Sequence, residues 1–393
     1  MQVFEHRLAR GSLNVGEATR GALAAPHKFP RLAQSIVAGD KVALAVDRFV
    51  PAADEIVAAV VDELTTHGVA WDDVTVVAAD KSGSRTTPRL ATVPPSATSH
   101  RAPRFEVHDP ADRGRLGYLT NTKSGRPLYL NRTLLDADVV IAIGCARGRT
   151  SWNYRGAWGG VYPTFSDDES LARFRNPRVL DRNDEVFLKS QAEVETVGWL
   201  SGAQFTVQAL PGRGDDVVGV VAGDAATIAE VVDPWWNEHW VARIPQRVDT
   251  VVAALTGTHA QTWTHVGRAL AAAADAVAPG GAILLCTELD QPLGPGLKQL
   301  AEVEDHAPAL DRLRKQRPED LLEAIELIEA RRGARLYLLS RSDPAEIEAL
   351  GITPVESAAD VGRFAARSKS CLVLTDAQYA AAISDEPADR ADG

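Results

Sequence analysis

The stretch ADVVIAIGCARGRTSWNYRGAWGGVYPTF, residues 137–165, decides which fold we expect. It begins with Val139–Ile143, a continuous apolar run that is mostly β-branched, as in strands buried on both faces of a parallel sheet. From Gly144 the polarity inverts, and glycines alternate with arginines and aromatic residues. The stretch therefore predicts a buried strand that runs directly into a glycine-rich loop.

This glycine-rich loop is the first candidate for a ligand site. Open α/β sheets bind ligands just beyond the carboxyl ends of their strands, and loops in that position often carry function. The alternative is a surface loop whose aromatic side chains only fasten it to the sheet. In the first interpretation, the loop residues that contact a ligand are Trp152, Arg155, Trp158, Gly159 and Gly160.

Upstream of this stretch, the pattern is that of a βαβ unit. A strand at Lys41–Val46 is followed by an amphipathic helix at Ala52–His67 and by a second strand at Val74–Ala79. Strand, helix and strand at this spacing indicate parallel pairing, so the loops after both strands lie at the same edge of the sheet.

Both of these loops carry groups suited to a ligand. Asp47 could accept a hydrogen bond from a ribose hydroxyl or orient a base, and it could equally cap the helix that follows. The second loop places Lys81, Ser82 and Arg85 within a few residues, a donor-rich pattern that suits a phosphate or a carboxylate. A solvated polar turn is the other interpretation of that loop.

The rest of the chain adds further elements and a second α/β pattern. A hairpin is expected at Gln204–Leu210 and Val217–Ala222, and a helix at Ala225–Val241 with an interruption at Pro234. Pro245 marks a boundary. The elements expected after it are a strand at Val248–Ala254, a helix at Thr262–Val277, a Pro279-Gly280-Gly281 turn, a strand at Ala282–Cys286, a helix near Pro318–Arg331, a strand at Arg335–Ser340, a helix at Pro344–Leu350 and a strand at Cys371–Thr375.

We therefore predict an α/β fold of two domains with largely parallel sheets and a cleft between them. The first domain covers 1–244, the second covers 245–383, and 384–393 forms a disordered tail. In the second domain, His265 and Arg268 are three residues apart and can share one helix face. If that face lines the cleft, they are an acid/base and anion-binding pair; otherwise they are surface residues.

Composition and missing motifs exclude several classes of protein. The 393 residues carry a net charge of −11, which argues against nucleic-acid and anionic-membrane partners because both need concentrated lysine and arginine. No apolar run approaches the length of a membrane span, and the three cysteines lack the spacing of a zinc site or a disulfide framework. P-loop, GxGxxG, HExxH, GxSxG and CxxC motifs are absent as well. We expect a cytoplasmic protein with a small anionic ligand, and the pattern indicates no particular oligomeric state.

Several runs resemble a known family. LTNTKSGRPLYLNR at 119–132 and ADVVIAIG at 137–144 look like segments of the N-terminal domain of the nickel-pincer-nucleotide lactate racemases. VGVVAGD at 218–224, PGGAI at 279–283 and GITP at 351–354 fall where that family has similar segments. The resemblance covers nearly the whole chain. It implies a two-domain α/β enzyme whose cleft holds a nickel-carrying pyridinium nucleotide that accepts a hydride from the 2-carbon of a hydroxy acid.

The residues that carry the family's chemistry differ in this chain. A Gly-Thr-His loop after the second strand appears here as Lys81-Ser82-Gly83, and Tyr162 stands where the family has a lysine that tethers the cofactor. No histidine that would bind nickel occurs in 173–183, so we name no metal ligand. The resemblance thus implies the nickel-pincer nucleotide as cofactor, while its expected tether and nickel ligands are missing.

The resemblance also sets the functional expectation. It implies a racemase- or epimerase-type isomerase that acts on a small 2-hydroxy acid or sugar acid in the interdomain cleft, by hydride transfer if a family-type cofactor is bound. Tyr162, Lys81 and His265 are then the candidate proton-handling groups, and Arg268 a binding residue. The alternative is a non-catalytic protein that binds a small anion or a nucleotide on the same scaffold.

Overall fold

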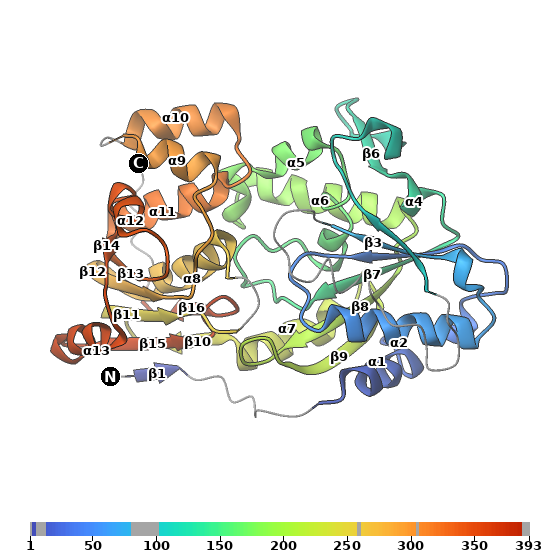
Figure 1. The fold of residues 1–393 in the computed structure, drawn as a ribbon, viewed down its shortest axis with the longest axis horizontal. Helices are drawn as coiled ribbons and strands as arrows, with labels where there is room; N and C mark the ends of the chain where they lie inside the picture. Colours follow the sequence, from blue (N-terminus) through green and yellow to red (C-terminus); the bar gives the residue numbers. More distant parts are fainter. Residues whose placement is uncertain (1, 5–12, 80–101, 258–260, 304–305, 387–393) are drawn as a thin grey trace.

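The computed structural model describes residues 2–4, 13–79, 102–257, 261–303 and 306–386. The chain forms two halves, each built on a six-stranded sheet. Figure 1 shows the first half in blue to green and the second in yellow to red. The predicted α/β class with largely parallel sheets is confirmed. None of the helices in these ranges combines the length and the hydropathy that crossing a membrane requires.

The first sheet has the strand order β4-β3-β2-β7-β8-β9, and all its pairings are parallel except that of β8 with β9. Its central strands β2 and β7 consist of apolar residues, most of them small or β-branched, and nearly all of their side chains are buried, so both faces of the sheet must be covered. The strands are β2 (Val42–Val46), β3 (Val74–Ala78), β4 (Arg104–Val107), β7 (Val139–Cys145), β8 (Phe205–Pro211) and β9 (Val217–Asp224).

Helices and loops cover both faces of this sheet. On one face, Leu44 and Ile141 pack with Ile56 of α2 and Leu23 of α1. On the other face, Val140 and its neighbours pack against the loop after β7 and against α6. The remaining elements of this half are α1 (Val15–Ala24), η1 (Leu32–Gln34), α2 (Ala53–Thr66), η2 (Trp71–Asp73), η3 (Arg113–Arg115), the hairpin of β5 (Leu116–Asn121) and β6 (Pro127–Asn131), α4 (Arg132–Leu135), η4 (Ala157–Gly160), α5 (Asp168–Phe174), η5 (Pro177–Leu180), α6 (Glu185–Leu200) and α7 (Ala229–His239).

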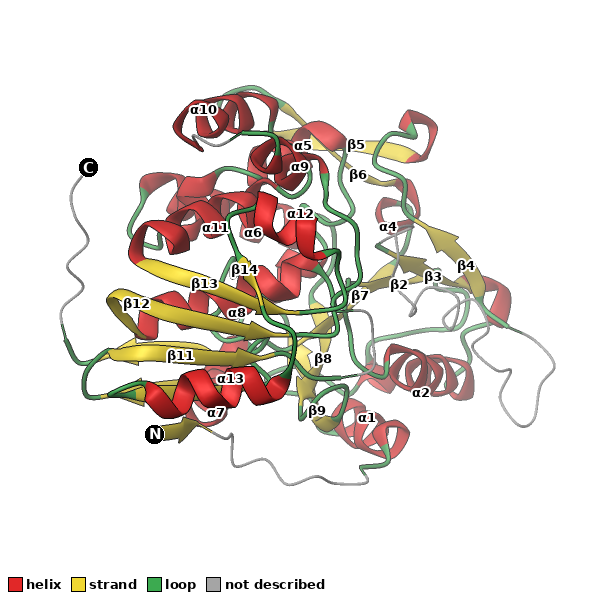
Figure 2. Cartoon of the chain, turned by 60° about the vertical axis from the view of Figure 1, so that its left-hand side comes forward, coloured by secondary structure: helices red, strands yellow, loops and turns green. Residues whose placement is uncertain are grey.

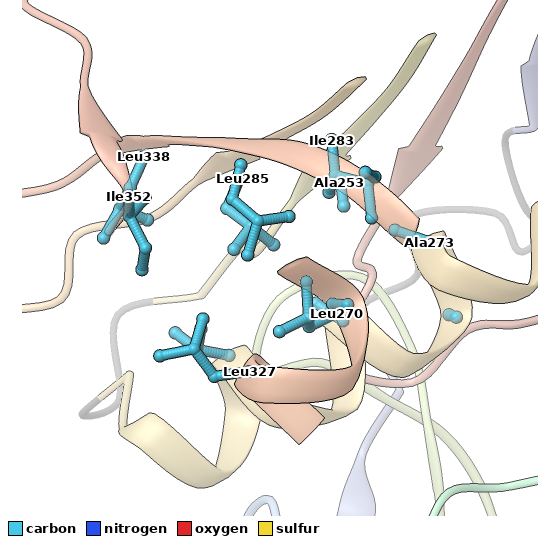
Figure 3. Packing of buried hydrophobic residues seen from close by; sticks show 14 of the residues in the cluster. Ala253, Leu270, Ala273, Ile283, Leu285, Leu327, Leu338 and Ile352 are labelled. Carbon is cyan, nitrogen blue, oxygen red and sulfur yellow. The ribbon is translucent and has the colours of Figure 1, made fainter. Parts of the chain in front are cut away.

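The second sheet has the order β1-β15-β11-β12-β13-β14, and all its pairings are parallel. Its main core lies between the sheet and helices α8 and α11; Figure 3 shows Leu270 and Leu327 of these helices facing Ile283, Leu285 and Leu338. The elements are β1 (Gln2–Phe4), β11 (Val248–Ala254), α8 (Trp263–Ala276), β12 (Val277–Cys286), α9 (Pro295–Ala301), α10 (His306–Gln316), α11 (Leu321–Gly333), β13 (Ala334–Leu339), α12 (Pro344–Ala349), β14 (Thr353–Pro354), α13 (Ala358–Arg367) and β15 (Cys371–Thr375).

Two pairs of strands join segments that are far apart in the sequence. β1 pairs with β15 at the edge of the second sheet, and Figure 1 shows this blue strand among the red ones. β10 (Val241–Ile244) pairs in parallel with β16 (Ala381–Ser384). The first and last few residues of the predicted domain 1–244 therefore lie with the second half. Residues 387–393 of the predicted tail lie outside the described residues.

The structure corrects three local predictions. The Pro279-Gly280-Gly281 turn lies inside β12, because Gly280 adopts a positive φ of 75° and a register shift between β11 and β12 absorbs the bend. The helix at Ala225–Val241 begins at Ala229 and continues past Pro234 without interruption, and its end is buried through Trp236. The helix near Pro318–Arg331 begins at Leu321, and α9, α10 and α13 were not predicted.

Candidate active site

The first sheet changes direction between β2 and β7. The chain passes from β2 outward to β3 and β4, and it then returns to add β7 on the other side of β2. Crevices at such switch points, beyond the carboxyl ends of the strands, are where open α/β sheets bind ligands. A cavity of about 1010 Å³ lies here, and its walls include Asp47 after β2 and Gly144–Arg147 at the end of β7.

The second half closes the cavity from the opposite side. Thr264 and Arg268 of α8 and Glu323 of α11 line it, together with Glu319 and Leu322. Figure 2 shows that α8 and α11 lie on the side of the second sheet that faces the first half. The cavity therefore lies between the two halves, as the sequence predicted.

The loop after β7 reaches the end of β2 because two of its residues have no side chain. A Cβ on Gly160 would lie 3.3 Å from Cβ of Asp47, and a Cβ on Gly159 would lie 2.5 Å from Cβ of Arg155. Trp152 fixes the far end of the loop to the second half, since its Nε1–H donates to Oε2 of Glu326 on α11 at 2.9 Å. The loop is thus held against both halves.

Trp158 forms one wall of the cavity and packs on α6. Its Nε1–H donates to the carbonyl oxygen of Ala203 at 2.6 Å. Its ring lies over Gly198, where a Cβ would come within 2.2 Å of the ring. The missing side chain at Gly198 is what allows the indole to lie this close to the helix.

The cavity is lined by arginines, namely Arg48, Arg147, Arg149, Arg155, Arg175, Arg182 and Arg268. Burial lowers the pKa of four of them, Arg147, Arg155, Arg175 and Arg268, to about 10 in the case of Arg155. Mutual repulsion between Arg147 and Arg268 lowers the pKa of Arg147 further. Guanidinium groups stay protonated near neutral pH, so they offer positive charges that can bind an anion. Six described carboxyl-bearing residues also line the cavity, namely Asp47, Asp109, Asp168, Glu195, Glu319 and Glu323.

The contacts of Arg268 indicate that this side chain binds an anionic ligand. Its Nε is buried and has no hydrogen-bond partner among the residues that the structure describes. Its guanidinium lies 5.9 Å from the ring centroid of Phe49, the second residue after Asp47. A buried donor without a partner is unfavourable by about 1–3 kcal/mol, so a ligand that accepts this hydrogen bond would be held strongly.

Two carboxyl groups face the arginines from opposite halves. Burial raises the pKa of Asp47, although the adjacent Arg48 N–H donates to its Oδ1 at 2.7 Å. Burial also raises the pKa of Glu323, whose Oε1 accepts a hydrogen bond from Thr264 Oγ1 at 2.7 Å. Arg155 and Arg268 both interact electrostatically with these two carboxyls. The four groups therefore belong to one constellation.

Most of the predicted binding residues meet at this cavity. Those that line it are Asp47, Trp152, Arg155, Trp158, Gly159, Gly160 and Arg268. The predicted Lys81, Ser82 and Arg85 lie outside the described residues, although Ala79, just before them, lines the cavity.

The structure places Tyr162 in a separate buried cluster. Its hydroxyl donates to Oε1 of Glu193 at 2.5 Å and accepts from Arg173 at 2.9 Å, and Arg173 forms an ion pair with Glu193. Tyr162 is fully buried and is not among the residues that line the cavity. This geometry favours a role in supporting the glycine-rich loop, and a proton-handling role for Tyr162 stays a prediction without support from its position.

His265 lies in the first turn of α8 and is not among the residues that line the cavity. Its Nδ1 accepts a hydrogen bond from the Thr262 backbone N–H at 3.2 Å, which completes a capping box. Its ring packs edge-on against Phe49 with centroids 4.6 Å apart. Burial, and then the charges of Arg268 and Arg147, lower the pKa of His265 to about 3. The imidazole is therefore neutral near pH 7 and is a weak base.

We expect His265 to make stability depend on pH. Its pKa is lower in the folded state, about 3, than the ordinary value of 6.5, so below pH 6.5 the unfolded chain binds a proton that the folded chain does not. The contribution of His265 to the free energy of unfolding is therefore fully present above pH 6.5 and decreases as the pH falls toward 3. Urea unfolding of the wild type between pH 7.5 and 5 should show this loss, and His265→Gln should show less of it. Glutamine retains a capping-box side chain, and equal pH dependence of the two proteins would contradict the assignment.

Sequence reasoning missed Glu323, Arg147 and Arg175 as members of the site. Glu323 lies in a helix whose charged residues resemble any solvated face, and only the packing of α11 against the first half brings it to the cavity. Arg147 was visible in the opening stretch, three residues after Gly144. Its position directly after a buried strand is the signal that could have selected it.

Comparison with known proteins bears on the first half directly. Residues 1–185 match the family model described as the lactate racemase N-terminal domain. The matched region includes β2, β7, the glycine-rich loop and α5, and hence the Asp47 and Arg155 wall of the cavity.

Solved structures extend the likeness over both halves. The chain is similar to the lactate racemase apoprotein from Thermoanaerobacterium thermosaccharolyticum, with a TM-score of 0.78 at 15% sequence identity over 97% of this chain and 94% of that one. It is also similar to a protein from Thermotoga maritima, with a TM-score of 0.71 at 13% identity over 96% of this chain and 100% of that one. Comparison with curated proteins gives no match. The structural likeness shows that the fold beyond residues 1–185 is shared as well.

The described side chains do not fit a tethered nickel nucleotide. Within the described ranges, no lysine lines the cavity and no group of three or more His, Cys, Asp or Glu residues could hold a metal ion. His108 is the one histidine of the described cavity lining, and its Nε2 lies 2.8 Å from the Ser166 carbonyl oxygen. Burial lowers the pKa of His108, which fits this internal contact. The described side chains therefore support no reaction step through nickel.

Proposed function

We propose that this chain is a racemase- or epimerase-type isomerase of a small 2-hydroxy acid or sugar acid, bound in the cavity between the halves. The observation that carries the proposal is the arginine-lined cavity at the switch point between β2 and β7, in which Arg268 holds a buried donor without a partner. A substrate carboxylate is the anion that suits such a donor set. The match of residues 1–185 to the lactate racemase N-terminal domain supports the same reaction class.

The proton-handling groups that the cavity offers are Asp47 and Glu323. They come from opposite halves, so a bound acid between them exposes one face to each. One carboxylate takes the proton from C2, the C–H electron pair moves into the substrate carboxyl group, and the other carboxyl returns a proton to the opposite face. Arg155 and Arg268, which interact with both carboxyls, stabilise the charge that develops on the substrate. The raised pKa of each carboxyl favours a mixture of protonation states closer to neutral pH.

The proton route makes a specific prediction about the two carboxyls. Asp47→Asn and Glu323→Gln should each reduce the rate of interconversion by about 100-fold or more while leaving the acid bound, since each removes one proton-transfer group. The measurement is chiral chromatography of a panel of D- and L-hydroxy acids. Wild-type reactions in D₂O should place deuterium at C2 of the product.

The control reactions distinguish the proton route from its competitors. Glu329→Gln changes an exposed carboxylate on the same helix as Glu323 and should retain full activity. Product without deuterium at C2 would show direct hydride transfer and remove Asp47 and Glu323 from the proposed step. Binding without interconversion by the wild type would favour the alternative, a protein that only binds a small anion or a nucleotide.

A further inference from the structure

Phe49 has a backbone conformation that is unusual for a bulky residue. Its φ is +58°, in the left-handed region, where the Cβ of a non-glycine residue is crowded by the backbone. Such a conformation persists only where the surrounding structure imposes it, and positions of this kind cluster at functional sites. Phe49 lines the cavity and is the second residue after Asp47. Its contacts should therefore account for the conformation.

The chain is anchored on both sides of Phe49. The Asp47 backbone N–H donates to the carbonyl oxygen of Ile143 on β7 at 2.9 Å. Val50 is buried in the core of the first half, whereas Phe49 is not part of that core. Only two residues thus lie between a strand end and a core side chain. The left-handed turn at Phe49 allows Val50 to enter this core while the Phe49 ring stays outside it.

The Phe49 ring contacts the second half of the molecule. It packs edge-on against His265 with ring centroids 4.6 Å apart, and Cζ of Arg268 lies 5.9 Å from its centroid. Both residues belong to α8. The His265 ring is itself fixed, because its Nδ1 accepts a hydrogen bond from the Thr262 backbone N–H at 3.2 Å. Phe49 is therefore held by one residue of α8 and lies beside another.

An aromatic ring is well suited to holding a cation that must bind an anion. The ring attracts a guanidinium group within about 6 Å of its centroid, and it has no oxygen that would occupy the N–H donors. Within the described ranges, Arg268 forms no ion pair and no side-chain hydrogen bond, and its Nε is buried. The Phe49 ring therefore restricts the guanidinium from one side and leaves its donors available to a ligand.

We propose that Phe49 is a positioning residue that reaches from the first half to α8 and holds the Arg268 guanidinium where it binds the substrate carboxylate. This inference rests on the proposed function and adds to it the residue that sets the geometry of its anion site. The unfavourable φ at Phe49 is retained because it directs the ring toward α8. The short connection from Asp47 to Phe49 then fixes the carboxylate site relative to Asp47.

The test measures the affinity of the full-length protein for lactate, malate and gluconate by isothermal titration calorimetry. Phe49→Leu keeps a Cβ and an apolar side chain but has no ring, so binding of the acid that the wild type holds most tightly should weaken about tenfold. Phe49→Gly fits the positive φ without strain and should lose at least as much affinity. Phe49→Tyr keeps the ring and should stay within about threefold of the wild type.

A double-mutant cycle identifies the residue through which Phe49 acts. If the ring acts through the guanidinium, Phe49→Leu should change affinity by less than about twofold in a protein that already carries Arg268→Met. Equal losses with and without Arg268→Met would overturn the inference and leave the hydroxy-acid proposal intact. A loss in Phe49→Tyr as large as that in Phe49→Leu would overturn it as well.

A matched aromatic substitution serves as the control. Phe364→Leu removes a ring that packs against Tyr337 with centroids 4.9 Å apart, and neither residue lines the cavity between the halves. Its affinities should equal those of the wild type, and a similar loss would show that the effect is not specific to Phe49. No binding of any of the three acids, by a wild-type protein whose circular dichroism is that of a folded α/β chain, would overturn the proposed function together with this inference.

Discussion

Replacement of Arg268 by methionine is expected to stabilise the ligand-free protein and, at the same time, to weaken carboxylate binding by about 100-fold. Arg268 carries a buried Nε without a described hydrogen-bond partner, and it repels Arg147. Methionine fills a similar length without a charge, so both unfavourable contributions disappear. A gain of about 1 kcal/mol in the free energy of unfolding is the expected size, since a buried donor without a partner is unfavourable by about 1–3 kcal/mol and the lost attraction to Asp47 and Glu323 offsets part of this gain.

The binding loss in Arg268→Met follows from the same contacts. Removal of one partner from a desolvated charge pair lowers affinity by about 2–5 kcal/mol, and 100-fold corresponds to about 2.7 kcal/mol. Urea unfolding measures the first effect and calorimetric titration of a hydroxy acid measures the second. Arg332→Met on the exposed face of α11 is the matched control and should change neither quantity much. A variant that loses stability as well as affinity would show that Arg268 has a structural role.

Substitution of alanine for Gly198 should destabilise the protein by about 2–4 kcal/mol and impair ligand binding. The added Cβ would lie 2.2 Å from the ring of Trp158, at the base of the indole where no flexible end can move away. Overpacking of this kind is unfavourable by about 1–3 kcal/mol, and loss of the Trp158 hydrogen bond to Ala203 adds about 1 kcal/mol. Because Trp158 lines the cavity, its displacement also changes the site.

Gly362 on α13 is the control for Gly198. A Cβ there meets no atom within 4 Å, so Gly362→Ala should stabilise the protein by about 0.5–1 kcal/mol through the higher helix propensity of alanine. Chemical unfolding curves and tryptophan fluorescence of both variants give the comparison. Gly198→Ala with wild-type stability would mean that α6 can move away from the loop without loss, and it would weaken the account of how Trp158 is positioned.

The central sheet could be predicted from the sequence because its strands are short, almost entirely apolar runs rich in valine and isoleucine. β2, β3 and β7 have this pattern, and the loops between them contain the residues that the first sheet brings to its edge. The α10 and α13 helices have no comparable apolar run, so they were missed. β1, β10 and β16 are three or four residues long, and only partners that are distant in the sequence make them strands.

The residues of the candidate site that lie after the ends of strands could be predicted from the sequence. The residues that reach the site only because the two halves pack together could not. Asp47 follows β2 directly, Arg155 and the paired glycines lie in the loop after β7, and the sheet order brings these two segments together. Glu323 reaches the cavity through the packing of α11, which no local pattern encodes. Sequence position suggested Tyr162 and His265 as reactive groups, yet each forms hydrogen bonds within the protein instead.

Because β1 pairs with β15, removal of the amino-terminal residues should lower the solubility of the protein. A shortened chain that begins after residue 12 would leave the backbone N–H and C=O groups of β15 exposed along one side. Unprotected strands at a sheet border recruit strands from other molecules, so this shortened chain should self-associate even though its cavity is intact. An affinity tag is accordingly better placed at the carboxyl terminus than in front of Gln2.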